Sequence, residues 1–316
     1  MTEKATIAVI GATGAQGGGL VRAILDAPES GFAARAITRD PDSEKARALA
    51  DRGVEVVQAD TDDEASLRRA FDGAHGVYCV TNYWEHFSPE REIVQAANMA
   101  RAAKAASVQH VIWSTLEDTR QSIPLTDDRM PTLNVKYKVP HFDAKAEADA
   151  KFREAGVPTT FLLTTYYWEN MIYFGMGPKP GPDGTLAISM PMGDRKLPGL
   201  AVGDIGACAF GVFRRGTEWA GRYVGVAGEH HTGAEMAEAL TRALGRKVVY
   251  RDVPPDVYRG LGFPGAVELG NMFQFYRDFA DDICAARPIA VCRELHPGLQ
   301  TLAQWLEVHK DRIPLE

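Results

Sequence analysis

The chain has 316 residues, of which 45% are hydrophobic and 24% are charged, a composition typical of a globular protein with a large core. Its formal net charge of -7 argues against non-specific binding to nucleic acid or to an anionic membrane surface. No run approaches the ~18 apolar residues of a membrane span, and the four cysteines form no disulfide framework. Because the first strand pattern starts directly after Met1-Thr2-Glu3-Lys4, we expect a cytoplasmic protein.

Short apolar runs and helical patterns alternate through the first half of the chain. Repeated βα units of this kind predict a Rossmann-type α/β fold, a doubly wound parallel sheet with helices on both faces. In such sheets ligands bind beyond the carboxyl ends of the strands. The expected strands cover residues 5–10, 32–38, 54–59, 76–81, 110–114 and 158–163, and helical patterns lie at about 43–51, 64–72, 88–106 and 141–155.

The turn between the first strand and the first helix has the glycine spacing of a phosphate-binding site. Gly11 permits a tight turn, Gly14 lets the backbone approach phosphates, and Gly17 lets the helix pack close to the sheet. Free N–H groups at the helix start then face the pyrophosphate. The alternative is an ordinary strand–turn–helix joint without a ligand. The cofactor-binding residues expected here are Gly11, Thr13, Gly14, Ala15, Gln16 and Gly17.

The loops after the second and third expected strands carry residues suited to the adenosine end of a dinucleotide. Arg39 lies where NAD-binding proteins usually place an acidic residue, and an arginine there suits a 2′-phosphate. We therefore expect NADP(H) in preference to NAD(H). The alternative is a solvated arginine that pairs with Asp40 or Asp42. Asp60 and Thr61 are expected beside the adenine, and the alternative for this acidic run is a helix N-terminus.

Three further strand ends are expected near the nicotinamide. Thr81 and Asn82 should pass under the adjoining ribose, and two aromatic residues follow them. Thr115 follows the fifth strand, where a hydroxyl would face a reacting carbonyl. Tyr166 begins an aromatic segment that should close over the nicotinamide, although core packing explains such side chains equally well.

His141 and Lys145 are four residues apart in a helix, so they share one face. The glycine spacing resembles that of the short-chain dehydrogenase superfamily, in which this place holds a proton-donating tyrosine and a lysine that binds the ribose. His141 has three interpretations: a general acid, a remnant in a protein that binds cofactor without turnover, or a solvated first-turn residue. For Lys145 the alternative to a cofactor contact is a surface pair with Asp149.

The second half of the chain predicts a smaller α/β domain. We expect residues 1–165 to form the dinucleotide-binding domain, with 201–228 returning to it. Residues 166–200 and 229–316 then form a substrate or partner domain. The polar loop 119–140 is long enough for a lid or a partner surface. No spacing of histidine, cysteine or acidic residues predicts a metal site.

Several separated segments, in the same order, resemble the NmrA-like family, with the closest likeness to HSCARG-type NADPH-sensor proteins. The resemblance implies an atypical short-chain dehydrogenase fold and NAD(P) binding, often without the catalytic tyrosine. Some members are regarded as redox sensors or transcriptional co-regulators, whereas others are working reductases. The segments are 11–18, 80–85, 141–145, 261–266 and 271–273, and the implied cofactor contacts are Gly11, Thr13, Gly14, Arg39 and Lys145.

Two functional hypotheses follow. The first is an NADP(H)-binding redox sensor or regulator, whose cofactor occupancy alters a surface for a regulatory protein partner. The second is an NADPH-dependent reductase of a small carbonyl- or quinone-like substrate, in which Lys145 holds the ribose and His141 or Thr115 supplies or relays the proton. We expect no direct nucleic-acid binding and no membrane insertion. The identity of the substrate or partner and a homodimeric state stay open.

Overall fold

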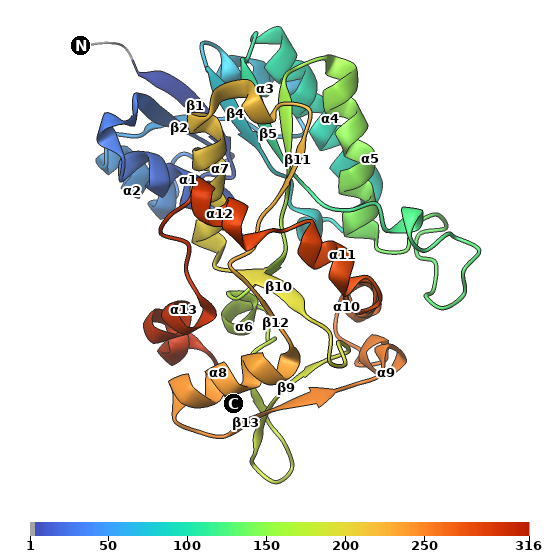
Figure 1. Ribbon diagram of the computed structural model, residues 1–316. Coiled ribbons are helices and arrows are strands. Elements are labelled where there is room, and N and C mark those ends of the chain that lie inside the picture. The colour runs from blue at the N-terminus through green and yellow to red at the C-terminus, as the bar shows by residue number, and fades with distance from the viewer. Residues whose placement is uncertain (1–3, 316) are drawn as a thin grey trace.

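The computed structural model describes residues 4–315 and is built on a seven-stranded parallel sheet (Figure 1). The strand order is β11-β6-β5-β4-β1-β2-β3, and every neighbouring pair is parallel. Because the chain winds outward in opposite directions from β1 and β4, the fold predicts that a ligand binds beyond the carboxyl ends of these two strands, a region called the crevice below. The strands are β1 (Ala5–Ile10), β2 (Phe32–Thr38), β3 (Glu55–Gln58), β4 (Gly76–Cys79), β5 (His110–Thr115), β6 (Thr159–Leu163) and β11 (Tyr223–Gly225).

Helices cover both faces of this sheet, which confirms the predicted doubly wound α/β class (Figure 1). The first face packs against α1 (Ala15–Leu25), α2 (Glu44–Asp51), α7 (Val202–Arg214) and α12 (Ile289–Leu295). The second face packs against α3 (Glu64–Phe71), α4 (Pro89–Ala105) and α5 (Pro140–Ala155). Alternate residues of β1 serve the two layers, because Val9 points into the first core and Ala8 into the second.

The glycines of α1 allow two close backbone contacts. A Cβ atom at Gly17 would lie 2.5 Å from the carbonyl oxygen of Gly11, so the turn fits only against a glycine. A Cβ atom at Gly206 of α7 would lie 2.0 Å from the amide nitrogen of Leu20. The helices α1 and α7 therefore touch backbone to backbone. This contact explains the glycine at position 19, where a Cβ atom would lie 2.7 Å from the carbonyl oxygen of Gly203.

A smaller part lies beyond the carboxyl edge of the main sheet (Figure 1). It has two three-stranded sheets, ordered β12-β10-β7 and β13-β9-β8. Within residues 4–315, no helix is both long and apolar enough to cross a bilayer. The strands of the smaller part are β7 (Tyr166–Tyr167), β8 (Lys179–Pro180), β9 (Leu186–Met190), β10 (Leu197–Leu200), β12 (Glu229–His231) and β13 (Val248–Asp252). Its helices are α6 (Asn170–Tyr173), α8 (Gly233–Leu244), α9 (Pro255–Arg259), α10 (Ala266–Asp278), α11 (Ala280–Ala285) and α13 (Leu302–His309).

The second half of the chain returns to the main sheet twice. The first return brings α7 and β11, which pairs with β6. The second brings α12, where Cys292 and Leu295 join the same core as α1 and α7. The sequence pattern predicted a return over 201–228 and did not indicate the one made by α12.

The long loop 119–140 is anchored at its base. The ammonium of Lys138 is buried and donates hydrogen bonds to the carbonyl oxygens of Asp127 and Met130, at 2.6 and 2.7 Å. The side-chain amide of Asn271 in α10 donates to the carbonyl oxygen of Lys138 at 2.6 Å. These bonds satisfy backbone groups that a long loop would otherwise leave to water. The base of the loop is thus fixed to the smaller part.

Candidate functional site

The glycine turn presents the open end of α1 at the crevice. Gly11 has a φ of 65°, which glycine adopts without strain. Gly14 is the N-cap residue, and no side chain caps the helix. The first turn also carries no acidic residue. The N–H groups of Ala15, Gln16 and Gly17 lie in this first turn, where a helix offers them no internal acceptor. The turn therefore suits an anionic group, such as a pyrophosphate.

Gln16 links the turn to several strand ends. Its side-chain oxygen accepts hydrogen bonds from the hydroxyls of Tyr78 in β4 and Ser114 in β5, at 2.5 and 2.8 Å. Its amide nitrogen donates to the hydroxyl of Tyr167 in β7 at 2.7 Å. Since β7 belongs to the smaller part, Gln16 connects the glycine turn with that part directly. Burial raises the pKa of Tyr78, so its phenol stays protonated.

Arg39 lies after β2 and forms an ion pair with Glu85, a residue of the 3₁₀ turn at Tyr83–Glu85 that follows β4. Both side chains remain accessible, at 59% and 41% of their areas. The hydrogen bond from Arg39 lowers the pKa of the Glu85 carboxyl. The alternative pairing with Asp40 or Asp42 is not what the structure has.

The three acidic residues after β3, Asp60, Asp62 and Asp63, have different contacts. Asp63 caps α3, because its carboxylate accepts hydrogen bonds from the backbone of Ala65 and Ser66. Asp62 pairs with Arg91 of α4, and the hydrogen bond from that arginine lowers the pKa of Asp62. Asp60 accepts the N–H of Asp62. The helix-terminus interpretation therefore holds for Asp63, and nothing in this arrangement stops Asp60 from facing an adenine.

Thr61 and Asn82 have more limited contacts. The carbonyl oxygen of Thr61 accepts a hydrogen bond from the side chain of Asn98 at 2.9 Å, which ties the loop after β3 to α4. Asn82 is exposed, and its carbonyl oxygen accepts the N–H of Glu85. The side chain of Asn82 is thus free to meet a ligand at the edge of the sheet.

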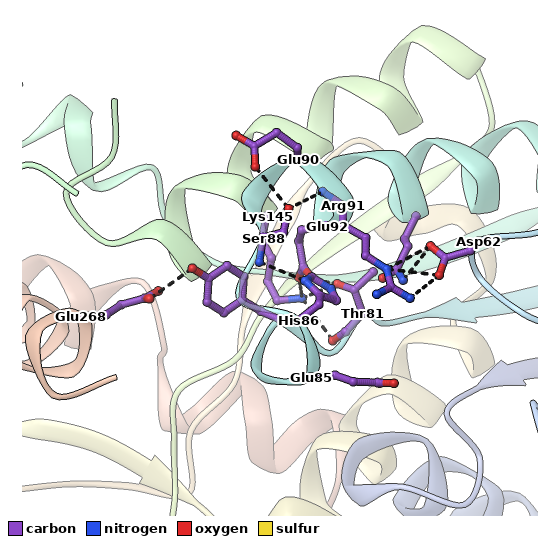
Figure 2. Close-up of polar contacts among 12 residues, drawn as sticks. Asp62, Thr81, Glu85, His86, Ser88, Glu90, Arg91, Glu92, Lys145 and Glu268 are labelled. Atoms are coloured by element: carbon purple, nitrogen blue, oxygen red, sulfur yellow. Dashed lines mark hydrogen bonds and ion pairs between the residues drawn. The ribbon is translucent and has the colours of Figure 1, made fainter. Parts of the chain in front are cut away.

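Lys145 is buried beside a carboxylate that sequence reasoning did not identify. Its ammonium lies 2.7 Å from Glu92 of α4 and donates to the hydroxyl oxygen of Thr81 at 2.6 Å (Figure 2). The side chain of Glu92 is fully buried. The alternative interpretation of Lys145, a surface ion pair with Asp149, is therefore wrong. A sequence signal existed, because Glu92 falls on the same apolar stripe of α4 as Ala96 and Met99.

His86 completes this buried group. Its Nδ1 accepts the N–H of Ser88 at 3.0 Å, so the neutral ring carries its proton on Nε2. That Nε2 faces the second carboxylate oxygen of Glu92 at 3.6 Å, and neither atom has a hydrogen-bond partner among residues 4–315. Figure 2 shows His86, Glu92, Thr81 and Lys145 gathered on one side of the turn.

His141 is held by Glu268, which comes from α10 in the smaller part. The carboxylate of Glu268 accepts the backbone N–H of His141 at 2.7 Å and its Nδ1–H at 2.6 Å. The hydroxyl of Tyr83 donates to the other oxygen of Glu268 at 3.1 Å. The indole of Trp84 lies with its ring centre 4.7 Å from the imidazole. His141 is therefore buried and oriented, so the solvated interpretation is wrong.

Thr115 and Tyr166 lie in other surroundings. The hydroxyl of Thr115 is fully buried and donates to Asp149 at 2.7 Å, on the face of the sheet covered by α5. Burial raises the pKa of Asp149 to about 6. Tyr166 packs in the core of the smaller part, near Phe273, and its hydroxyl has no partner within residues 4–315. Neither hydroxyl lies with the His141 and Lys145 groups described above.

The chain is similar to proteins of one family along nearly all its length. A sequence model of the NmrA-like family matches residues 3–306. The NmrA-like family domain-containing oxidoreductase FrzB of Cladobotryum sp is 28% identical over 290 residues, which span 85% of this chain and 83% of FrzB.

Two solved structures share the fold. NmrA, a negative transcriptional regulator solved in complex with NADP, has a TM-score of 0.78 and 24% identity, with 97% of this chain and 95% of NmrA covered. The triphenylmethane reductase of Citrobacter sp., solved with NADP(H), has a TM-score of 0.74 and 23% identity, with 97% and 99% covered. These likenesses do not single out the HSCARG-type sensors, so that closer resemblance stays a prediction.

Proposed function

The chain belongs to the NmrA-like family, and from this premise we propose that it binds NADP(H) at the carboxyl edge of its seven-stranded sheet. The observation that carries the proposal is the uncapped N-terminus of α1, which lies at the glycine turn where the sheet changes winding direction. Relatives of the same fold support it, because NmrA is solved with NADP and the Citrobacter reductase with NADP(H).

The described residues fit such a cofactor. The first-turn N–H groups of α1 would hold the pyrophosphate, and Arg39 would meet the 2′-phosphate. Lys145, with Thr81 beside it, would hold the nicotinamide ribose. When bound, the reduced cofactor supplies a hydride. Asp60, Thr61, Asn82 and Tyr166 remain candidate contacts.

We propose that the main role is that of a redox sensor or regulator. The support is that side chains at the carboxyl edge of the main sheet form hydrogen bonds with the smaller part. Gln16 of the phosphate-binding turn bonds Tyr167, and His141 and Tyr83 share Glu268 of α10. A ligand that displaces these side chains changes contacts in the smaller part, and the two states then differ in cofactor affinity. The partner would be a protein that binds one of the two states.

A second candidate is a reductase, favoured by the His141–Glu268 pair. Because the carboxylate only accepts, the Nδ1 of His141 donates to it and Nε2 is left for a substrate. A protonated His141 could give the Nε2 proton to a carbonyl or quinone oxygen, while Glu268 stabilises the cation. FrzB is named an oxidoreductase, which agrees with this alternative.

One experiment separates the two candidates. Purified protein is mixed with NADPH and a panel of quinones, aldehydes, ketones and imines, and cofactor binding is measured in the same preparation by calorimetry. His141→Asn is the informative variant, since its amide can still donate to Glu268 but carries no titratable proton. A sensor binds NADPH without turnover, and the variant binds it equally well.

A reductase shows turnover that falls at least about 100-fold in His141→Asn with the cofactor affinity unchanged, the scale of a lost general acid. Turnover that survives in this variant would contradict the role given to His141. Absence of NADP(H) binding by the wild-type protein would overturn both candidates.

A further inference from the structure

The Arg39–Glu85 ion pair lies across the crevice in which the cofactor is proposed to bind. Arg39 follows β2, and Glu85 lies in the turn after β4. In the sheet, β2 and β4 are the two neighbours of β1, and the glycine turn starts at the end of β1. The pair therefore joins the strands on either side of the phosphate-binding turn. Figure 2 shows Glu85 apart from the Lys145 group.

Two arginines at this edge are already paired with carboxylates. Arg39 is paired with Glu85, and Arg91, the next arginine along the edge, is paired with Asp62. The carboxylate of Asp60 adds a further negative charge near Arg39. A 2′-phosphate that approaches Arg39 thus meets an arginine already neutralised and at least two carboxylates. Binding is more favourable if one of these anions gives way.

Glu85 is the anion that can give way. Its side chain is 41% exposed and it sits in a short 3₁₀ turn, so it can rotate into water at little cost. An exposed ion pair of this kind contributes little to stability. A 2′-phosphate carries up to two negative charges and offers bidentate geometry to the guanidinium, so it is the stronger ligand.

We propose that Glu85 is an internal substitute for the 2′-phosphate, so that NADP(H) exchanges with Glu85 on Arg39 whereas NAD(H) leaves the pair intact. The inference rests on the proposed NADP(H) site and adds a specificity-determining residue to it. The exchange also frees the turn that carries Tyr83 and Trp84, which contact Glu268 and His141. The conformation of this turn would thereby differ between the chain with bound NADP(H) and the chain with bound NAD(H).

The test compares two nucleotide probes that differ at one position, 2′,5′-ADP and 5′-AMP. Their dissociation constants are measured by calorimetry on the full chain and on Glu85→Gln, which removes the competing charge and keeps the shape. The matched control is Glu55→Gln, because Glu55 is 55% exposed and forms its ion pair with Arg35 rather than with Arg39. The control changes net charge equally and leaves Arg39 alone.

We expect Glu85→Gln to bind 2′,5′-ADP about three- to tenfold more tightly, the range set by releasing one exposed pair and one like-charge contact. Its affinity for 5′-AMP, and both affinities of Glu55→Gln, should stay within about twofold of the wild-type values. An equal gain for both nucleotides, no gain, or a loss for 2′,5′-ADP would overturn the exchange. Failure of the wild-type chain to bind 2′,5′-ADP or NADP(H) would instead overturn the proposed function.

Discussion

Lys145 and His141, which were predicted at the places of a ribose-binding lysine and a proton donor, are each paired with a separate carboxylate. Glu92 lies 2.7 Å from the Lys145 ammonium, and Glu268 lies 2.6 Å from the His141 imidazole. An unpaired ammonium would lower the pKa of a neighbouring acid, but a neutralised one has a much weaker field. Lys145 is thus better suited to holding a ribose than to tuning His141. If His141 transfers a proton, Glu268 is the residue that supports it.

The Glu92–Lys145 pair predicts strong coupling between two substitutions. Glu92→Leu leaves a buried ammonium and Lys145→Met leaves a buried carboxylate, and each should destabilise the protein by about 3–5 kcal/mol. The double variant removes both charges and should lose less stability than either single one. Urea unfolding of the four proteins without cofactor measures the cycle. Additive losses would show that the two groups do not interact.

Asp149 predicts a specific pH dependence of stability. Its carboxylate accepts hydrogen bonds from Trp113, Thr115 and Tyr223, but burial dominates and raises its pKa from 3.8 to about 6. Between these values the folded state holds the proton more tightly, so its stability falls as the pH rises from about 4 to 6. The expected loss is about 3 kcal/mol, since one pKa unit corresponds to about 1.4 kcal/mol.

Asp149→Asn should remove this decline. The difference in free energy of unfolding between the variant and the wild type should shift by about 3 kcal/mol in favour of the variant between pH 4 and pH 7. Urea titrations across this range measure the shift. A difference that does not change with pH would mean that Asp149 is ionised in the fold at low pH, contrary to the assignment.

At the scale of elements, the α1–α7 contact links core packing to the phosphate-binding turn. A methyl group at Gly206 would lie 2.0 Å from the Leu20 nitrogen and 2.3 Å from the Gly19 carbonyl carbon, so the helices must separate. A methyl group at Gly203, one turn earlier in α7, would meet only the end of the Arg22 side chain, at 3.4 Å. The two positions therefore form a matched pair for testing the contact.

Gly206→Ala should cost about 3 kcal/mol by overpacking, despite the ~1 kcal/mol that alanine gains over glycine in a helix. It should also weaken NADP(H) binding, because α1 carries the N–H groups proposed to hold the pyrophosphate. Gly203→Ala should be neutral or stabilising in thermal unfolding and leave cofactor affinity unchanged. Equal effects of the two substitutions would contradict a specific backbone contact at Gly206.

For the molecule as a whole, the sequence is informative where the physics is local and silent where it depends on distant partners. Alternating apolar runs and glycine spacing depend on neighbours in the chain, so the six strands expected in the first half were predicted to within two residues and the glycine turn was placed between β1 and α1. The short strands β7, β8, β9, β10 and β12 of the smaller part were not predicted. The partners of Lys145, Arg39 and His141 lie elsewhere in the sequence, on α4, on the turn after β4 and on α10. A periodic pattern cannot reveal which carboxylate folds onto which cation.

Glu268 is a second residue, besides Tyr167, by which the smaller part touches the proposed cofactor site, and it carries the prediction at this scale. In the wild-type chain, NADP(H) should change the hydrogen-exchange protection of α10, because the sites of His141 and Tyr83 share that carboxylate. Glu268→Ala should abolish this response while NADP(H) affinity stays within about threefold, since Glu268 lies outside the phosphate-binding groups.

Two comparisons make the result specific. Glu268→Gln keeps the side-chain shape and is the control for misfolding of Glu268→Ala. Its amide leaves the buried N–H of His141 and the hydroxyl of Tyr83 with a polar neighbour. Tyr167→Phe removes the hydroxyl that bonds Gln16 and Thr164, so it breaks the other link and should leave the response of α10 in place. If α10 responds to NADP(H) in Glu268→Ala as it does in the wild type, the two parts are coupled elsewhere, and the sensing role must rest on Gln16 and Tyr167 instead.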